Sequence, residues 1–231
     1  MIDRRRHYIL VLDTETANTQ LNEAGQLDTS SCLVYDCGWQ VIDTHGNVYE
    51  KASYVNSDIF YHESELMQSA YYAAKIPQYL EDIANGKRLV ANTYEIRKAM
   101  IDTIKLYEIK EVCAHNSRFD LNALNTTERW TTKSKYRYWF PKDIIIWDSM
   151  RMASDVILKM PTYRKFCEKH DIFTKTGRLS CTAENLYRFI IKDPDYIESH
   201  TGLEDVEIES QIIAYCYRQH KKMRKELFTK S

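Results

Sequence analysis

An uninterrupted apolar run from Tyr8 to Leu12 leads directly into the sequence Asp13-Thr14-Glu15-Thr16. A run that is apolar on both faces predicts a short strand at the buried centre of a sheet. Side chains two residues apart on a strand point the same way, so Asp13 and Glu15 are expected to converge at the C-terminal end of this strand. Unpaired carboxylates are costly to bury, whereas carboxylate oxygens are ligands that suit Mg²⁺ and Mn²⁺. The pattern therefore predicts half of a metal site.

The composition is that of an ordinary globular protein. The chain has 231 residues, of which 44% are hydrophobic and 28% are charged, which is enough for one sizeable core and a single domain. Only 6 Gly and 4 Pro argue against a loop-rich all-β fold and favour long helices around a compact sheet. A formal net charge of −1 excludes a nucleic-acid binder held by bulk positive charge, so such contacts would come from local patches.

Neither the N-terminus nor the cysteines indicate export. No apolar stretch approaches the ~20 residues of a membrane span, and residues 1–6 lead into the first strand without a cleavable apolar segment. The 6 Cys residues form no CxxC pair, so we expect reduced thiols rather than disulfides or a zinc site. These features predict a cytoplasmic protein without a membrane partner, in the host cytoplasm if a phage encodes it.

Hydrophobic periodicity predicts alternating strands and helices, and hence an α/β layer fold. Residues 33–42 and 48–55 are expected to form a hairpin around the turn residues 43–47. No repeat, low-complexity tract or linker divides the chain, so one domain is expected. Two further short strands are expected at 111–115 and 143–147. The predicted helices are 65–74, 77–84, 96–107, one that begins near 119, one that begins at 148, 162–170, 182–191 and about 205–227.

Two other acidic residues stand at predicted element boundaries. Asp120 ends the segment His115-Asn116-Ser117-Arg118-Phe119-Asp120, and Asp205 opens the last helix five residues after His200. At such boundaries both carboxylates can turn toward the end of the first strand, where two divalent cations would neutralise the crowded charge and hold a phosphate. Each signal alone is weak. Asp120 could be a helix cap, and His200 with Asp205 could be a surface histidine and an N-cap.

Taken in order along the chain, these residues resemble the DnaQ-like 3′–5′ exonucleases of the DEDDh subtype, which carry four carboxylates and a histidine in three motifs. The matching motifs are Asp13-Thr14-Glu15-Thr16, the segment 115–120, and His200 with Asp205. The resemblance extends over about residues 7–220.

This resemblance implies a ribonuclease-H-like α/β fold. Its mixed central sheet, an antiparallel meander followed by parallel strands, would be flanked by helices. Residues 1–231 would form a single exonuclease domain, with an insertion at about 125–141.

The same resemblance implies release of nucleoside 5′-monophosphates from the free 3′ end of a nucleic acid with the help of two Mg²⁺ or Mn²⁺ ions. Asp13 would bridge both ions, and Asp120 would support one of them. Glu15 and Asp205 would complete the site of the ion that activates water. His200 would be the general base, a role that an imidazole pKa near ~6.5 suits at neutral pH.

The resemblance also suggests residues near the substrate. Leu12, Thr14 and Thr16 would contact the terminal nucleotide, the leucine as a small wedge and the threonines as hydroxyl donors. Asn116 and Phe119 would support the second motif beside the substrate.

A second candidate substrate surface is the segment 133–142, which interleaves four cations with four aromatic residues. This composition suits phosphate contacts and base stacking, with Lys135, Tyr136 and Arg137 as candidate substrate residues. It favours single-stranded DNA or a 3′ overhang as the substrate. An equally open alternative is an aromatic-rich insertion that packs on the core with its cations in water.

Several alternatives stay open. One is an RNA-directed exoribonuclease of the same family, and another is a non-catalytic nucleic-acid-binding module on the same fold. A phosphatase of the haloacid dehalogenase type also ends an apolar strand in an acidic pair, but Glu15 and Ala17 depart from that pattern. His115 is expected to be a core histidine at a strand end rather than a catalytic one. Several relatives form homodimers, so the oligomeric state is open too.

Overall fold

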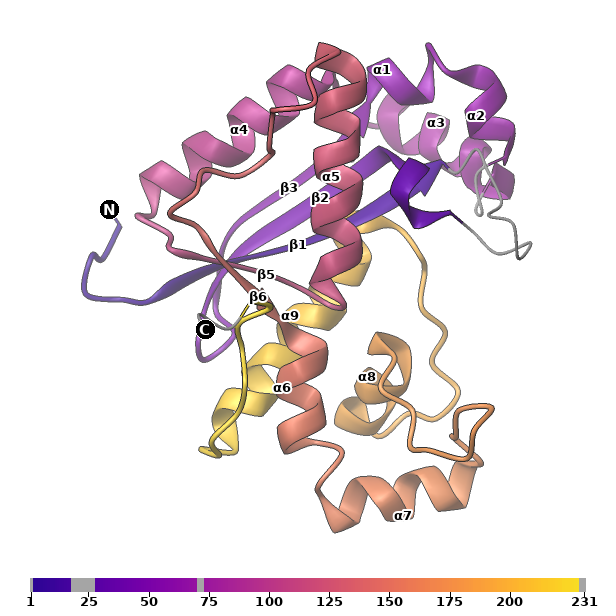
Figure 1. The fold of residues 1–231 in the computed structure, drawn as a ribbon. Coiled ribbons are helices and arrows are strands. Elements are labelled where there is room, and N and C mark those ends of the chain that lie inside the picture. The colour runs from indigo at the N-terminus through magenta and orange to yellow at the C-terminus, as the bar shows by residue number, and fades with distance from the viewer. Residues whose placement is uncertain (1, 18–27, 70–72, 229–231) are drawn as a thin grey trace.

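A six-stranded mixed sheet forms the centre of the molecule (Figure 1). The computed structural model describes residues 2–17, 28–69 and 73–228. The strands β1, β2 and β3 are antiparallel, whereas β5 and β6 run parallel to β1, which confirms the predicted meander followed by parallel strands. The order across the sheet is β4-β3-β2-β1-β5-β6. The strands are β1 (Tyr8–Ala17), β2 (Leu33–Asp43), β3 (Val48–Asn56), β4 (Leu89–Ala91), β5 (Glu111–Ala114) and β6 (Ile145–Asp148).

Helices flank this sheet, as the α/β prediction requires. The predicted helix at 65–74 corresponds to α2, and its residues 70–72 lie outside the described part of the chain. The helices are α1 (Ser57–Phe60), α2 (Ser64–Ser69), α3 (Ile76–Ala84), α4 (Thr93–Leu106), α5 (Ser117–Thr132), α6 (Ser149–Val156), α7 (Pro161–His170), α8 (Ala183–Ile191) and α9 (Gly202–Arg218), with 3₁₀ turns η1 (Thr29–Ser31) and η2 (Ala73–Lys75).

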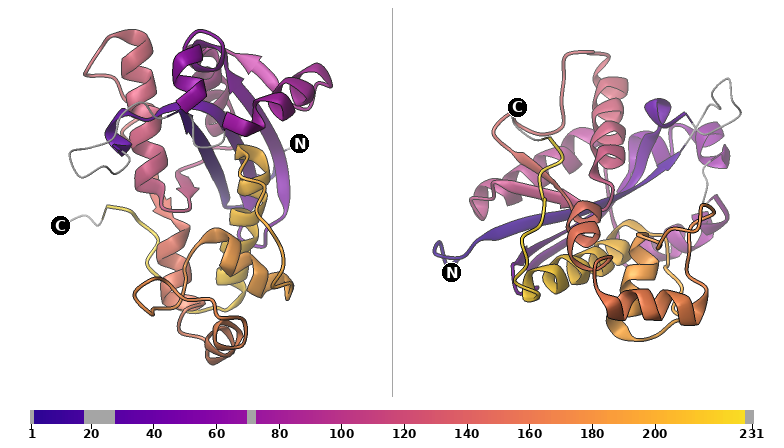
Figure 2. Two further views of the ribbon diagram at one scale, coloured as in Figure 1. Left: turned by 90° about the vertical axis from the view of Figure 1, so that its right-hand side faces the viewer. Right: turned by 60° about the horizontal axis from the view of Figure 1, so that its bottom comes forward.

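The strand β1 is buried on both faces, which explains its continuous apolar run. Leu10 and Leu12 pack in a core formed with residues of α4 and α5, whereas Ile9 and Val11 pack in a core formed with residues of α6, α7, α8 and α9. Figure 2 shows helices on both faces of the sheet. The alternation of side chains along a strand therefore sends successive residues of β1 into two separate cores. Asp13 and Glu15 continue the series of Ile9 and Val11, which places them toward α9.

The last helix is shorter than predicted. It ends at Arg218 rather than near Leu227, and the chain then returns along the edge strand β6. The backbone N–H of Asp148 donates to the carbonyl of Lys225 at 2.8 Å, and that of Leu227 donates to the carbonyl of Ile146 at 2.8 Å. These bonds to a sheet edge replace the helical bonds that the sequence pattern suggested.

The segment 125–141 is partly helix and partly loop. Residues up to Thr132 belong to α5, and a loop then leads to β6. Trp139 and Phe140 are buried in the core beside α4 and α5. Their burial agrees with packing of the aromatic residues on the core, while Tyr136 is 78% exposed.

Two further observations concern the whole described chain. None of its helices within residues 2–17, 28–69 and 73–228 is long and apolar enough to cross a membrane. All 6 cysteines carry free thiols, and most of them are buried as small core residues.

Candidate active site

The strand β1 carries Asp13 and Glu15 past the end of its parallel neighbour. Parallel pairing of β1 with β5 stops at Val11, opposite Cys113, whereas antiparallel pairing with β2 continues to Ala17. The sequence pattern predicted a short strand with the two acids at its C-terminal end. In the structure the strand has ten residues, and both acids lie within it. They emerge where the parallel half of the sheet has ended, and a shift in register after Glu15 bends the strand there.

Acidic side chains from two other elements meet this pair. Asp205 lies in the first turn of α9, and ligand oxygens of Asp13, Glu15 and Asp205 all lie within 4.8 Å of one another. Asp120 lies in the first turn of α5 and is 3% exposed. The hydroxyl of Thr14 donates to Oδ1 of Asp120 at 2.8 Å, which ties α5 to β1 at this point. The structure thus brings the four predicted carboxylates to one end of the sheet.

Burial and mutual repulsion disfavour negative charge on these groups. Burial raises the pKa of Glu15 to about 9, that of Asp205 to about 8 and that of Asp120 to about 7. Burial raises the pKa of Asp13 well above its usual range, and the neighbouring carboxylates add to this effect. The positive charge of Lys75 acts in the opposite direction, because it lowers the pKa of Glu15 and of Asp205. Among the described residues this positive charge is not enough to offset the burial of the carboxylates, because both pKa values stay raised.

The donor set fits divalent cations. It consists of carboxylate oxygens, which suit hard ions such as Mg²⁺ and Mn²⁺. Oδ1 of Asp205 is buried and has no hydrogen-bond partner among the described residues, so it is available as a ligand. Asp13, Glu15 and Asp205 could hold one cation, and Asp13 with Asp120 could hold another.

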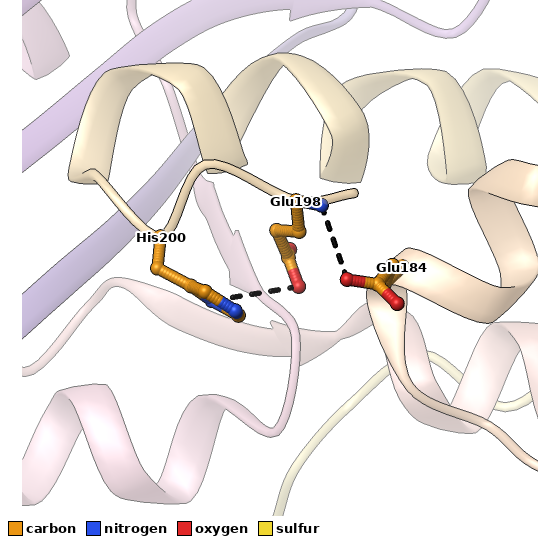
Figure 3. Close-up of side chains that lie close together, drawn as sticks. All are labelled: Glu184, Glu198 and His200. Carbon is orange, nitrogen blue, oxygen red and sulfur yellow. Dashed lines mark hydrogen bonds and ion pairs between the residues drawn. The ribbon is translucent and has the colours of Figure 1, made fainter. Parts of the chain in front are cut away.

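His200 lies in the loop that leads into α9. Its backbone is left-handed, with φ of 52°, and its side chain is 37% exposed. Nδ1 of His200 lies 3.8 Å from Oε2 of Glu198, which lies between His200 and Glu184 (Figure 3). Burial and the charge of Lys75 lower the pKa of His200, against the raising effect of Glu184. The imidazole is therefore neutral at pH 7 and able to accept a proton.

The group Glu184, Glu198 and His200 could be taken for another cation site, because ligand atoms of all three lie within 4.8 Å of one another. However, cations of the protein already face these carboxylates. Nη2 of Arg188 lies 2.7 Å from Oε1 of Glu184. Burial raises the pKa of Glu198 to about 7, although Lys75 and Arg188 both act to lower it. The backbone N–H of Glu198 also donates to Oε2 of Glu184 at 3.0 Å (Figure 3). We interpret the group as support for His200.

A buried ionic network anchors the start of α9. Oδ2 of Asp36, on β2, accepts the backbone N–H of Gly202 at 2.9 Å. Arg88 is 2% exposed and links Asp36 to Glu204. Its Nη1 donates to Oδ2 of Asp36 at 3.3 Å, and its Nη2 donates to Oε2 of Glu204 at 2.8 Å. This network fixes the helix start three residues before Asp205. The sequence analysis missed it, because its members are far apart in the chain.

Gly38 allows α9 to lie directly against β2. A Cβ atom on Gly38 would lie 2.4 Å from the backbone nitrogen of Leu203 and 2.5 Å from the carbonyl carbon of Gly202. The substitution Gly38→Ala is therefore expected to lower the free energy of unfolding by about 3 kcal/mol, because α9 must move away from β2. Urea unfolding would measure this loss. A glycine inside a predicted strand is the sequence signal for such a close approach.

The control for this prediction is Gly86→Ala. In the described part of the chain, no atom beyond the adjacent residues lies within 4 Å of the Cβ position of Gly86, so this variant meets backbone strain at φ of +71°, worth about 1 kcal/mol. Equal losses in the two variants would contradict a special role for the contact between β2 and α9.

His115 takes part in the core around the site. Its Nδ1 lies 2.8 Å from the hydroxyl of Ser149, and its Nε2 lies 2.7 Å from the carbonyl of Cys181. Burial lowers the pKa of His115. Both ring nitrogens are occupied within the protein, in agreement with the predicted core histidine.

The predicted contacts to the terminal nucleotide differ in accessibility. Leu12 is buried in the core under α4 and α5, because strand alternation places it on the same face as Leu10. Its expected role as a small wedge at the terminal nucleotide stays a prediction. Thr14 is also buried, and its hydroxyl is engaged with Asp120. Thr16 is half-buried.

The two residues of the second motif frame the start of α5. Asn116 is exposed and left-handed, with φ of 65°, and its backbone N–H donates to Oδ1 of Asp148 at 3.2 Å. Phe119 is half-buried and packs against the core under α5. These contacts hold the turn that presents Asp120.

The segment Lys135–Arg137 lies beyond the other end of α5 from Asp120 (Figure 1). The intervening helical turns place it about 20 Å away along the helix. The structure therefore does not bring Lys135, Tyr136 and Arg137 beside the carboxylates. Nζ of Lys135 lies 5.2 Å from the ring centroid of the exposed Tyr136.

Solved structures with this architecture include several 3′-exonucleases. The nuclease domain of 3′hExo, a DEDDh family member bound to rAMP, is 15% identical, with a TM-score of 0.59 over 95% of this chain and 96% of that one. A full-length 3′-exonuclease is 14% identical, with a TM-score of 0.59 over 95% and 85% of the two chains. Exonuclease I of E. coli in complex with a dA16 oligonucleotide is 14% identical, with a TM-score of 0.51 over 94% of this chain and 41% of that one.

At these identities the likeness shows a shared fold, which is the ribonuclease-H-like nuclease fold that the sequence predicted. No protein-family model matches the chain, and no curated protein matches it.

Proposed function

We propose that the protein is a metal-dependent 3′–5′ exonuclease that releases nucleoside 5′-monophosphates from nucleic acid. The observation that carries this proposal is the convergence of Asp13, Glu15 and Asp205 within 4.8 Å on a fold shared with 3′-exonucleases. Asp120, tied to the same strand through Thr14, supplies the fourth carboxylate. In this proposal residues 1–231 act as one exonuclease domain, in which 125–141 is an added segment.

The proposed roles follow from the chemistry of each side chain. Two bound Mg²⁺ or Mn²⁺ ions would stabilise charge on the scissile phosphate and lower the pKa of the attacking water. Asp13 would hold both ions, with Glu15 and Asp205 on one side and Asp120 on the other. His200 would take the proton of the attacking water, a task for which its lowered pKa keeps the imidazole neutral.

The proposed substrate is single-stranded DNA or a 3′ overhang. A surface cavity of about 1360 Å³ runs along α5, lined by Leu121 next to Asp120 and by Arg129 and Tyr138 toward the other end of the helix. The guanidinium of Arg129 lies 4.9 Å from the ring centroid of Tyr138, so a cation and an aromatic face lie together on this surface. Such pairs suit the phosphates and bases of a flexible single strand. Among the solved structures, Exonuclease I was seen with dA16 and another 3′-exonuclease recognises a histone mRNA stem-loop.

The experiment that tests the proposal follows the shortening of 5′-labelled oligonucleotides. Single-stranded DNA, single-stranded RNA, blunt duplex DNA and a duplex with a 3′ overhang would be incubated with Mg²⁺, with Mn²⁺ or with EDTA. We expect stepwise shortening from the 3′ end and mononucleotide 5′-phosphates as products, with no turnover in EDTA. We expect the single strand and the overhang to be digested faster than the blunt duplex.

The alternatives give different outcomes in the same assay. Preferential digestion of RNA would favour an exoribonuclease over the proposed DNA substrate. Binding of labelled strands without shortening, in any metal, would favour a non-catalytic module. Turnover that is unchanged by EDTA, or by replacement of Asp13, would exclude the proposed site as its source.

A further inference from the structure

A fifth acidic side chain, Glu209, stands one helical turn after Asp205 on α9. Residues four apart on a helix lie on the same face, so Glu209 extends the acidic face that Asp205 presents to β1. Glu209 is 3% exposed and lies between the apolar core residues Ile208 and Ile212 along the helix. Glutamate is rarely buried so deeply unless it is paired.

The surroundings of Glu209 contain little to pair with it. The backbone N–H of His115 donates to its carboxylate, whereas Oε2 has no hydrogen-bond partner among the described residues. The charged groups with the largest effects on the pKa of Glu209 are the carboxylates of Asp120, Asp205 and Glu198, which raise it. An ionised carboxylate in such a place would cost several kcal/mol without a cation.

Glu209 is also a close electrostatic neighbour of Asp13. Glu209 raises the pKa of Asp13 more than Asp205 or Glu15 does, and only Asp120 among the carboxylates has a larger effect. Glu209 therefore belongs to the same group of interacting carboxylates as Asp13. By contrast Glu207, two residues earlier on the same helix, is exposed and forms an ion pair with Lys51.

We propose that Glu209 is a fifth carboxylate of the metal pocket, which supports a cation held by Asp13. This inference rests on the proposed metal-dependent function. Burial raises the pKa of Glu209 well above the usual range, and a cation bound beside it would favour the ionised form. Cation binding would then be accompanied by release of a proton.

Calorimetric titration with Mn²⁺ tests this role without a substrate. The variant Glu209→Gln keeps the shape of the neutral side chain but cannot ionise. We expect it to bind one of the two ions about 10- to 100-fold more weakly, as for the loss of other groups that support a metal site. Repeating the titration in buffers of different ionisation enthalpy should show fewer protons released per protein molecule. Glu207→Gln, on the exposed face of the same helix, should match the wild type in both measurements.

Glu209→Asp provides a second variant should the glutamine variant fold poorly. It keeps the charge on a shorter side chain, so we expect Mn²⁺ affinity between those of the wild type and the glutamine variant. Wild-type Mn²⁺ affinity in Glu209→Gln would overturn the proposal. A Glu209→Asp variant that binds Mn²⁺ no better than Glu209→Gln would also overturn it, because the restored carboxylate would then have no effect.

The outcome is separable from that of the nuclease assay. If the wild type binds Mn²⁺ but digests no oligonucleotide, the proposed function fails while the role of Glu209 in the pocket can still hold. If the wild type digests oligonucleotides and Glu209→Gln binds both ions normally, the function stands and the inference on Glu209 fails.

Discussion

The variant Asp13→Asn is expected to lose at least about 1000-fold in the rate of nucleotide release and, in EDTA, to be more stable than the wild type. The loss of activity follows because a single carboxylate at the centre of the pocket would hold both cations, which supply several kcal/mol of transition-state stabilisation. The gain in stability follows because Asp13 is crowded by Asp120, Glu209, Asp205 and Glu15, all of which raise its pKa.

The sign of the stability change depends on pH. A carboxyl group whose pKa is raised in the folded protein contributes stability that is complete below the unfolded value near ~4. That contribution is lost as the pH rises through the folded pKa values, which are about 7 for Asp120, about 8 for Asp205 and about 9 for Glu15. The metal-free wild type should therefore become less stable between about pH 4 and pH 9.

Thermal unfolding in EDTA at pH 8 would measure the effect. We expect Asp13→Asn to raise the free energy of unfolding by about 2 kcal/mol and the melting temperature by about 4–8 °C. Added Mn²⁺ should stabilise the wild type far more than the variant, since a ligand that binds the folded state stabilises it. A variant that is less stable than the wild type in EDTA would contradict the crowding of Asp13.

The matched control is Asp43→Asn at the far end of the sheet. Hydrogen bonds from Asn47 and Tyr49 outweigh the effect of burial and lower the pKa of Asp43 to about 2. Its charge therefore stabilises the folded state at pH 8, and the same chemical substitution should destabilise the protein there. Changes of opposite sign in the free energy of unfolding for Asp13→Asn and Asp43→Asn would separate the crowding of the pocket from a general effect of replacing aspartate by asparagine.

The centre of the sheet could be predicted because hydrophobic patterning is strong there. Residues 8–12 are apolar on both faces, and the structure buries both faces under different helices. The two-residue period of a strand then assigned Asp13 and Glu15 to one face before any contact was known. The short strand β4 escaped prediction because it has three residues, of which Leu89 and Val90 are exposed at the sheet edge. Its pairing with β3 is decided by tertiary structure alone.

The surroundings of the site depend on contacts that no local pattern encodes. Arg88 meets Asp36 across 52 positions of the chain, and Asp36 meets Gly202 across 166. In the sequence, Arg88 and Asp36 are indistinguishable from ordinary charged surface residues. Glu209 was detectable in principle, because it interrupts the apolar face of the last helix one turn after Asp205. The sequence analysis predicted that helix from its hydrophobic periodicity and did not consider this acidic position.

The variant His200→Ala is expected to lower kcat by about 100- to 10,000-fold while both cations still bind. The ligand group at β1 consists of carboxylates and does not include His200, so removal of the imidazole should leave the metal pocket intact. Mn²⁺ titration by calorimetry should therefore match the wild type, in contrast to Asp13→Asn. A loss of metal affinity equal to that of Asp13→Asn would instead assign His200 to the pocket.

The pH profile gives a second measurement of the same role. A general base acts in its deprotonated form, so kcat/KM of the wild type should rise with pH through the pKa of His200. Burial and Lys75 lower that pKa below 6.5, and the rising limb should lie correspondingly at lower pH. Lys75→Gln removes the positive neighbour and should move the limb toward 6.5, whereas His200→Ala should abolish it. His45→Gln, on the exposed turn between β2 and β3, should leave the profile unchanged. The profiles are compared at saturating Mn²⁺, so that ionisation of the pocket carboxylates does not limit the rate. A rising limb that persists in His200→Ala under these conditions would contradict the assignment of His200 as the base, because the imidazole is then absent and its titration cannot shape the rate.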